Sequence, residues 1–225
     1  MPVSINGSNT PTAGGAVYGD GTAYATTAAG TAGQVLTSAG ASAPTWSTPS
    51  VGAMTLISTQ TASASSAISW TGLGTYNNYV LVIRNFIPSA TANITLVVGT
   101  GAGPTYITTS IYYQSSMILS SNNSTISSIP NGGIAYFDIG GGQQITSTTS
   151  GGYSAVINFV NMNATPASDL RMFADYTFPA SASVYRMGYT PCTVQSETTA
   201  KTAIKLALST GTITSGTASL YGISS

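Results

Sequence analysis

Tyr79-Val80-Leu81-Val82-Ile83 is the stretch of this sequence that decides the fold class. It is a near-continuous apolar run, rich in β-branched residues, and such a run is typical of a strand covered on both faces. Asn77-Asn78 directly before it indicates a turn. Ile94, Leu96 and Val98 alternate with other residues and predict the next strand. The centre of the chain therefore predicts a β-sheet with a buried middle.

Runs of the same kind continue to the end of the chain. They predict strands at residues 107–113, 134–139, 153–160, 170–178, 184–189, 203–208 and 218–223. No window places apolar residues at helical spacing over several turns. We therefore predict an all-β fold, an antiparallel β-sandwich of the jelly-roll type. A parallel β-helix is the rival architecture, but the chain shows no fixed repeat period.

The low charge content limits the classes of function that this chain can have. Charged residues make up 4% of the 225 residues, against about 25% in ordinary soluble domains. Five basic and five acidic residues give a net charge of zero, which favours association over dispersion. The basic residues are scattered, so no basic stripe is available to a nucleic acid. We interpret Lys201 and Lys205 as solvated charges at a sheet edge. The composition predicts an assembly component that binds no nucleic acid.

The beginning of the sequence, Met1-Pro2-Val3-Ser4-Ile5-Asn6, has neither the basic nor the apolar region of a secretory signal peptide. No later run approaches the roughly 18 apolar residues of a membrane span. We therefore expect synthesis in a cytoplasm, no secretion by that route and no membrane insertion. Cys192 is the single cysteine, which excludes an internal disulfide, and we interpret it as a small buried hydrophobic residue.

Residues 1–51 are rich in glycine, alanine and threonine and show little hydrophobic periodicity. Val17-Tyr18-Gly19-Asp20-Gly21 predicts a short strand running into a turn. The few larger side chains bury too little surface to offset a backbone entropy of roughly 1–2 kcal/mol per ordered residue. We predict an extended arm over residues 1–51 and a separate domain over residues 52–225. The arm contains a joint that needs a partner, formed by Gly33, Gln34, Val35, Leu36, Thr37 and Trp46.

The joint also carries a resemblance. The run Gly30-Thr31-Ala32-Gly33-Gln34-Val35-Leu36-Thr37-Ser38-Ala39-Gly40, closed by Ala43-Pro44-Thr45-Trp46, resembles a phrase of bacteriophage tail-fibre and related virion appendage proteins. In those proteins the phrase marks the boundary between an N-terminal particle-attachment region and a C-terminal domain. The alternative is a flexible linker that happens to contain one Val-Leu pair.

The C-terminal end carries a second resemblance to the same proteins. Leu220-Tyr221-Gly222-Ile223, preceded by a glycine-containing turn, is similar to the last strands of a β-sandwich domain found in phage appendages. Ile68-Ser69-Trp70-Thr71-Gly72-Leu73, followed by the run at Tyr79, is similar to the way that such a domain opens. Between these ends only the order of strands matches. The resemblance implies a trimeric β-sandwich at the tip of a fibre.

No catalytic centre is expected. The sequence has no histidine, which excludes catalytic triads and imidazole zinc sites. The carboxylates are Asp20, Asp138, Asp169, Asp175 and Glu197. Asp169 and Asp175 would lie about 20 Å apart on one strand, too far for the carboxylate pair of a glycosidase. A pair of Asp138 with Asp175 stays open, as does a weak calcium site at Asp138 beside its glycines. We expect no enzyme activity, no metal and no cofactor.

Aromatic side chains are the candidates for ligand contact. Tyrosine and tryptophan can stack on a sugar ring while their polar edges donate hydrogen bonds. The candidates for glycan contact are the aromatics at strand ends and in expected loops, namely Trp70, Tyr106, Tyr112, Tyr113 and Tyr185. For any one of them, a place in the core or in a subunit interface is the alternative.

The resemblance implies a structural virion protein at the tail periphery that mediates adhesion to the host cell. We expect self-association as a homotrimer and attachment through residues 1–51 to a tail or baseplate protein. The receptor would be a bacterial surface glycan or protein. A capsid decoration or head-fibre protein is the main alternative, and an enzyme that trims surface polysaccharide ranks behind it.

Overall fold

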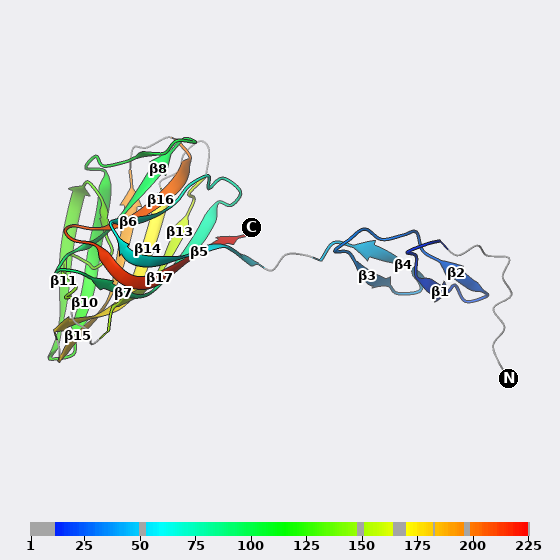
Figure 1. Ribbon diagram of the computed structural model, residues 1–225, viewed down its shortest axis with the longest axis horizontal. Coiled ribbons are helices and arrows are strands. Elements are labelled where there is room, and N and C mark those ends of the chain that lie inside the picture. Colours follow the sequence, from blue (N-terminus) through cyan, green and yellow to red (C-terminus); the bar gives the residue numbers. More distant parts are fainter. Residues whose placement is uncertain are drawn as a thin grey trace. The chain divides into compact units, whose positions relative to one another are not determined.

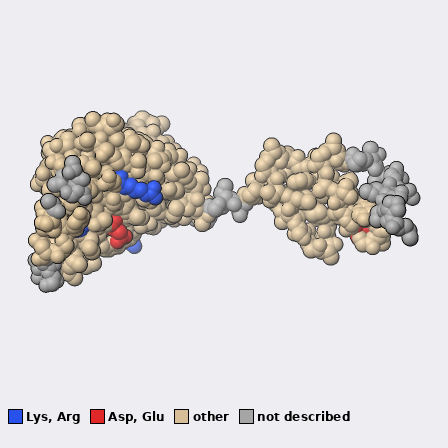
Figure 2. All heavy atoms as spheres, turned by 60° about the horizontal axis from the view of Figure 1, so that its bottom comes forward, with Lys and Arg blue, Asp and Glu red and all other residues tan. Residues whose placement is uncertain are grey.

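The computed structural model describes residues 12–49, 53–147, 151–163, 170–181, 183–195 and 199–224. The chain divides into two compact units, Met1–Val51 and Gly52–Ser225 (Figure 1 and Figure 2). The described ranges contain strands and no helix, which confirms the all-β class. Among these residues there is no helix long and apolar enough to cross a membrane.

The first unit consists of two small hairpins. β1 (Val17–Gly19) pairs with β2 (Tyr24–Thr26), and β3 (Val35–Ala39) pairs with β4 (Ser42–Ser47), both antiparallel. Asp20 closes the first turn, because its Oδ1 accepts hydrogen bonds from the backbone N–H groups of Thr22 and Ala23 at 2.8 and 2.7 Å. The predicted strand and Asp-Gly turn are therefore present at these positions.

Trp46 joins the second hairpin to the segment that follows the first. Its indole Nε1 donates to the carbonyl of Ala28 at 2.9 Å and to Oγ1 of Thr27 at 3.1 Å. The ring lies over Gly30, where an added Cβ would stand 2.6 Å from a ring atom. Only glycine leaves space for the ring at that position. One half-buried tryptophan thus organises a unit that has no apolar core of the usual size.

The second unit contains two antiparallel sheets (Figure 1). The larger sheet has the order β11-β10-β15-β14-β13-β7-β17-β5 and the smaller has the order β12-β8-β16-β6, with β9 beside β8. The strands of the larger sheet are β5 (Met54–Ser65), β7 (Asn78–Pro88), β10 (Tyr112–Ser120), β11 (Asn123–Ile134), β13 (Tyr153–Val160), β14 (Leu170–Ser181), β15 (Val184–Val194) and β17 (Ile213–Ile223). Those of the smaller sheet are β6 (Ala67–Trp70), β8 (Ile94–Thr100), β9 (Thr105–Tyr106), β12 (Phe137–Asp138) and β16 (Lys201–Leu208).

A single cluster of buried side chains drawn from both sheets forms the core of this unit. Leu81 on β7 lies opposite Ile157 on β13 and Leu220 on β17, and all three are fully buried. Leu96 and Leu206, paired across β8 and β16, contribute from the smaller sheet. Alternate residues of each strand point into this core, and the arrangement is that of a β-sandwich.

Several sequence expectations need correction. Of the strand predicted at residues 107–113, only Tyr112 and Tyr113 lie in a strand, the start of β10; β9 ends before this range, at Tyr106. The strand predicted at 134–139 is divided between the end of β11 and the two-residue β12. Lys201 is no solvated edge charge: its side chain is 2% exposed and its Nζ donates to the carbonyl of Thr199 at 2.7 Å. Lys205 is half-buried on a central strand of the smaller sheet.

Candidate interaction surfaces

β10 buries two polar side chains while it exposes two large apolar ones. Its inward side combines the apolar Tyr112 and Ile118 with the polar Gln114 and Ser116, and all four are buried. On its outward side Met117 and Leu119 are exposed. The inward polar groups are hydrogen-bonded, since Gln114 Oε1 accepts from the backbone of Asp138 at 2.9 Å and Ser116 accepts from Thr190 at 2.9 Å. No contact among the described residues of the unit explains why the apolar side chains of Met117 and Leu119 face outward.

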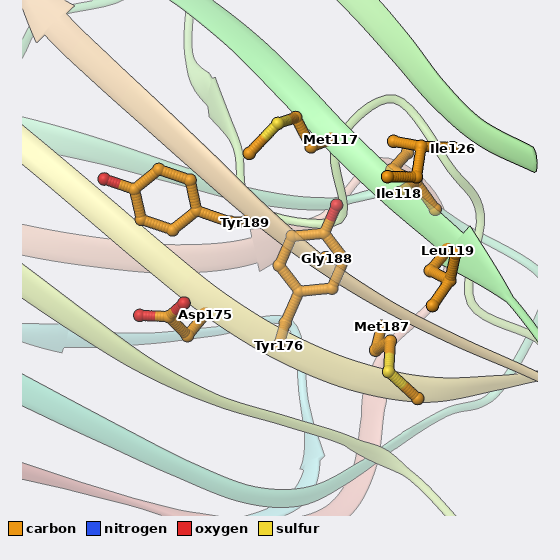
Figure 3. A pocket seen from close by; sticks show the side chains of 9 residues that line it. All are labelled: Met117, Ile118, Leu119, Ile126, Asp175, Tyr176, Met187, Gly188 and Tyr189. Carbon is orange, nitrogen blue, oxygen red and sulfur yellow. The ribbon is translucent and has the colours of Figure 1, made fainter.

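The neighbouring strands extend this apolar face. Ile126 on β11 is 63% exposed, Met117 on β10 is 55% exposed, and Met187 on β15 is exposed beside them. Together with Leu119 they surround a hollow of about 390 Å³. In Figure 3 Tyr189 and Asp175 lie at one side of this hollow and the aliphatic side chains at the other. We call this surface the methionine face.

The methionine face continues toward the middle of the larger sheet. The rings of Phe173 and Tyr189 stack with centroids 6.3 Å apart and planes at 14°. Val156 on β13 is exposed beyond them. Contiguous exposed apolar surface of this kind marks interaction sites in soluble proteins.

Two of the five aromatic candidates for glycan contact are wrong. Trp70 is 4% exposed, and its Nε1 donates to Ser58 Oγ at 2.9 Å inside the unit. Tyr112 is fully buried, and its hydroxyl donates to the carbonyl of Ile107 at 3.0 Å. Both side chains point inward because of the alternation along their strands, so neither presents a face to a ligand.

The other three aromatics lie in separate places. Tyr113 and Tyr185 are exposed on the larger sheet. Tyr185 pairs with Ser121 by backbone hydrogen bonding, so the two tyrosines stand about 27 Å apart along β10, eight residues at roughly 3.4 Å each. Tyr106 is half-buried against the smaller sheet under the ammonium of Lys205. The structure therefore does not gather the candidates into one site.

The joint residues divide into two groups. Gln34 closes its own turn, since its Oε1 accepts from the backbone N–H of Thr31 at 2.8 Å, and Gly33 adopts a positive φ of 88° beside it. Thr37 shares a hydrogen bond with the hydroxyl of Ser47. Val35 and Leu36, by contrast, are exposed apolar side chains. Gly33, Gln34, Thr37 and Trp46 thus have a structural explanation within the first unit, which leaves Val35 and Leu36 for a partner.

Asp138 lies in a buried polar network. Its carboxylate accepts hydrogen bonds from Asn93 Nδ2 at 2.7 Å and from the backbone N–H of Gly140 at 3.0 Å. Burial raises the pKa of this carboxyl group, and these hydrogen bonds oppose the rise. The N–H donors occupy the positions that a calcium ion would need, so the arrangement anchors the glycine loop and does not support the calcium interpretation.

The carboxylates do not form a catalytic pair among the described residues. Asp175 is exposed on the outer face of β14, whereas Asp138 is buried on the inner side, where its charge acts on Tyr153 and Tyr176. The structure therefore does not support the pair of Asp138 with Asp175 that the sequence left open. Asp169 and Glu197 lie outside the described residues.

Cys192 is buried, which confirms its interpretation as a small buried hydrophobic residue. Burial raises the pKa of its thiol to about 12. A thiol with such a pKa is protonated at neutral pH and is a poor nucleophile.

No protein-family description, curated protein or solved structure matches the chain.

The methionine face could not be read from the sequence. No strand was predicted at Met117 and Leu119, which lie between the strands expected at residues 107–113 and 134–139. Met187 lies in the strand predicted at residues 184–189, whose outward side was not identified. The pattern gives little signal, because both sides of this strand mix polar and apolar residues: Gln114 and Ser116 alternate with Ser115, Met117 and Leu119. The direction of a strand becomes known only with its neighbours, and β11, which completes the face, was not predicted.

Proposed function

We propose that this chain is a structural virion protein of the phage tail-fibre type. Residues 1–51 attach it to a tail or baseplate protein, and residues 52–225 form the head that recognises the host-cell surface, a bacterial glycan or protein. The protein acts by adhesion, without a chemical step, at the periphery of the tail. The proposal involves neither a nucleic acid nor insertion into a membrane.

The exposed apolar side chains of β10 carry this proposal. A freely diffusing domain would place Met117 and Leu119 inside and its polar side chains outside, because exposed apolar surface costs free energy in water. Here Gln114 and Ser116 are hydrogen-bonded inside, next to the buried Tyr112 and Ile118, while Met117 and Leu119 face outward. This pattern supports a face that is covered in an assembly. The resemblance supports a homotrimer as that assembly.

The finer fold assignment belongs to the proposal. We propose a jelly roll, because eight of the strands follow its interleaved order. They are β5-β17-β7-β13 in one sheet and β6-β16-β8-β12 in the other. The larger sheet then continues with β14, β15, β10 and β11, and the methionine face lies on this extension. We also propose that the first unit, with its exposed Val35 and Leu36, is the attachment arm.

Self-association is testable through Met117. Met117→Lys places a charge on the methionine face, and because the side chain is exposed the fold should remain intact. Sedimentation velocity should show an oligomer for the wild-type chain and a smaller species for the variant. Arg171→Gln, an exposed change on β14, serves as the control. Equal sedimentation of the wild type and Met117→Lys would contradict the role of this face.

Adhesion is testable by competition. The purified chain should reduce adsorption of the virus particles to their host in proportion to its concentration, and no saccharide should be released from the cell surface. Capsid decoration, the second candidate, also uses exposed apolar surface. It predicts instead that the chain binds emptied capsids and raises their heat resistance, with adsorption unchanged.

A further inference from the structure

We infer that the outer face of the smaller sheet holds a binding site for a sugar that carries a carboxylate, with Lys205 as the group that binds the anion. This inference rests on the proposed function and names the class of sugar that one site would take. The supporting observations are the position of the Lys205 ammonium group and the hollow beside this group.

The ammonium of Lys205 is available for an anion. Its Nζ lies 4.3 Å from the centroid of the Tyr106 ring, and within the described ranges it meets no carboxylate. An ammonium has three N–H donors, and a contact with a ring face leaves donors for a further acceptor. Arg186 differs, because its guanidinium already donates to the side chain of Gln143. Among the residues that the structure describes, Lys205 is thus a cation held in place without a counter-ion.

Tyr106 fixes the position of this ammonium. β9 places Tyr106 opposite Gly99 on β8, and its ring covers that glycine, where an added Cβ would lie 3.1 Å from a ring carbon. Lys205 on β16 is paired with Val97 of β8. The lysine side chain therefore reaches across β8 to a ring that the backbone holds in place.

Tyr136 stands on the other side of the same strand. Phe137 is paired with Leu96, so the preceding residue Tyr136 comes beside Val97, which has Lys205 as its partner on the opposite side. Adjacent strands are about 4.8 Å apart, which separates the backbones of Tyr136 and Lys205 by about 10 Å. Val97 forms the floor between a phenol ring and a cation.

A hollow of about 230 Å³ occupies this place. Its lining residues are Thr95, Val97, Thr108, Ala135, Tyr136, Lys205 and Ala207. The volume is below the roughly 300–1,000 Å³ that is usual for drug-sized ligands, so the hollow suits one ring. The hydroxyls of Thr95 and Thr108 add hydrogen-bonding groups, and Thr95 already donates to the carbonyl of Ala207 at 3.1 Å.

This combination of groups favours an acidic sugar over other anions. A tyrosine ring provides a stacking surface, threonine hydroxyls hydrogen-bond to sugar hydroxyls, and one ammonium matches one carboxylate. Phosphate sites usually gather several donors, such as arginine forks or the backbone N–H groups of a helix N-terminus. A neutral sugar would leave the ammonium without an anion. A uronic acid uses every group of the hollow.

The test is a titration of the full chain with methyl β-glucuronide, methyl β-glucoside and inorganic phosphate, followed by NMR or calorimetry at low salt. We expect the glucuronide to bind at least about tenfold more tightly than the glucoside or phosphate, and to weaken in high salt because the pair is exposed to solvent. Lys205→Gln should reduce glucuronide affinity at least about tenfold, the cost of losing a charge-assisted contact.

Three further variants sharpen the result. Arg171→Gln removes a cation from the larger sheet and should leave glucuronide binding unchanged. Tyr136→Ala should weaken binding, whereas Tyr106→Phe keeps the ring under the ammonium and should change it little. Unchanged affinity in Lys205→Gln, equal binding of glucoside, or equally tight binding of phosphate would each overturn the inference.

The outcome is separable from that of the proposed function. If the chain blocks particle adsorption but does not bind the glucuronide, the inference fails and adhesion stands. If it binds the glucuronide through Lys205 but does not affect adsorption, the site stands and the adhesive role fails. Thermal unfolding of each variant confirms that a loss of binding is not a loss of fold.

Discussion

The two units of this protein are stabilised in different ways. The second unit buries a continuous core of aliphatic and aromatic side chains between two sheets. The first unit depends on turns, hairpin hydrogen bonds and one half-buried tryptophan, and it exposes Val17, Tyr24, Val35 and Leu36. The difference teaches that a chain with 4% charged residues can still contain one self-sufficient domain and one unit with apolar groups left for a partner.

The largest effect is expected in the core of the second unit. Leu81→Ala removes a fully buried side chain that lies opposite Ile157 and Leu220, and it should lower the free energy of unfolding by about 2–5 kcal/mol. Val156→Ala on the neighbouring strand is the control, because Val156 is exposed, and it should change stability by less than about 0.5 kcal/mol. Chemical denaturation measures both. Equal losses would mean that the outer face is as well packed as the core.

A smaller effect, confined to the first unit, is expected from Trp46→Ala. The change removes two hydrogen bonds and the packing on Gly30, at a cost of about 2 kcal/mol because the ring is only half-buried. Amide NMR signals of residues 12–49 should lose their dispersion. The thermal transition of the second unit should stay where it is. A shift of that transition would contradict the independence of the two units.

A gain in stability is expected at Ala64. This residue follows Ser63 near the end of β5 with a φ of 50°, a left-handed conformation that costs an alanine roughly 1–2 kcal/mol. Ala64→Gly should therefore stabilise the second unit by about 1 kcal/mol. Ala67→Gly, at the start of β6, has no such strain and should destabilise by about 0.5–1 kcal/mol. The melting temperatures of the two variants should move in opposite directions.

The smallest effect is the response to pH, and its sign differs between the units. Burial raises the pKa of Asp138, so the folded state binds a proton on this carboxyl group more tightly than the unfolded chain does. Lowering the pH through the folded pKa of Asp138 should therefore stabilise the second unit. Hydrogen bonds from Thr22 and Ala23 lower the pKa of Asp20, so its contribution to the first turn is present at neutral pH and is lost as pH falls through the folded pKa.

Asp138→Asn isolates this response. The variant cannot ionise at position 138, so the part of the pH dependence due to Asp138 should vanish from the unfolding profile of the second unit. Asp20→Asn should leave that profile unchanged, because it lies in the first unit. If the wild type and Asp138→Asn have parallel profiles between pH 7 and about pH 4, the assignment of the raised pKa to Asp138 is contradicted.

Much of the fold follows from the sequence. The all-β class and the strand at residues 153–160 follow from β-branched residues and alternation, and β13 has those bounds. β11 was missed because Asn123-Ser124-Thr125-Ile126-Ser127-Ser128-Ile129-Pro130 is rich in residues that favour turns. Such a strand forms because β10 offers an unpaired edge, and edges are not visible in a sequence.

The sequence predicts less of the candidate surfaces than of the fold. Aromatic content indicated ligand contact, but whether Trp70 or Tyr113 faces outward depends on register, which only the pairing of strands determines. The burial of Lys201 likewise depends on the packing of segments distant in the chain. The hollow at Lys205 forms only because β12, β8 and β16 are neighbours in the smaller sheet. The local sequence pattern does not reveal which strands are neighbours.

The measurement that tests the account most directly is immunogold electron microscopy of purified virus particles with an antibody raised against residues 52–225. We expect label at the tail periphery, where a recognition head would stand. Label over the capsid would contradict it in favour of decoration, and particles without any label would contradict a place in the virion.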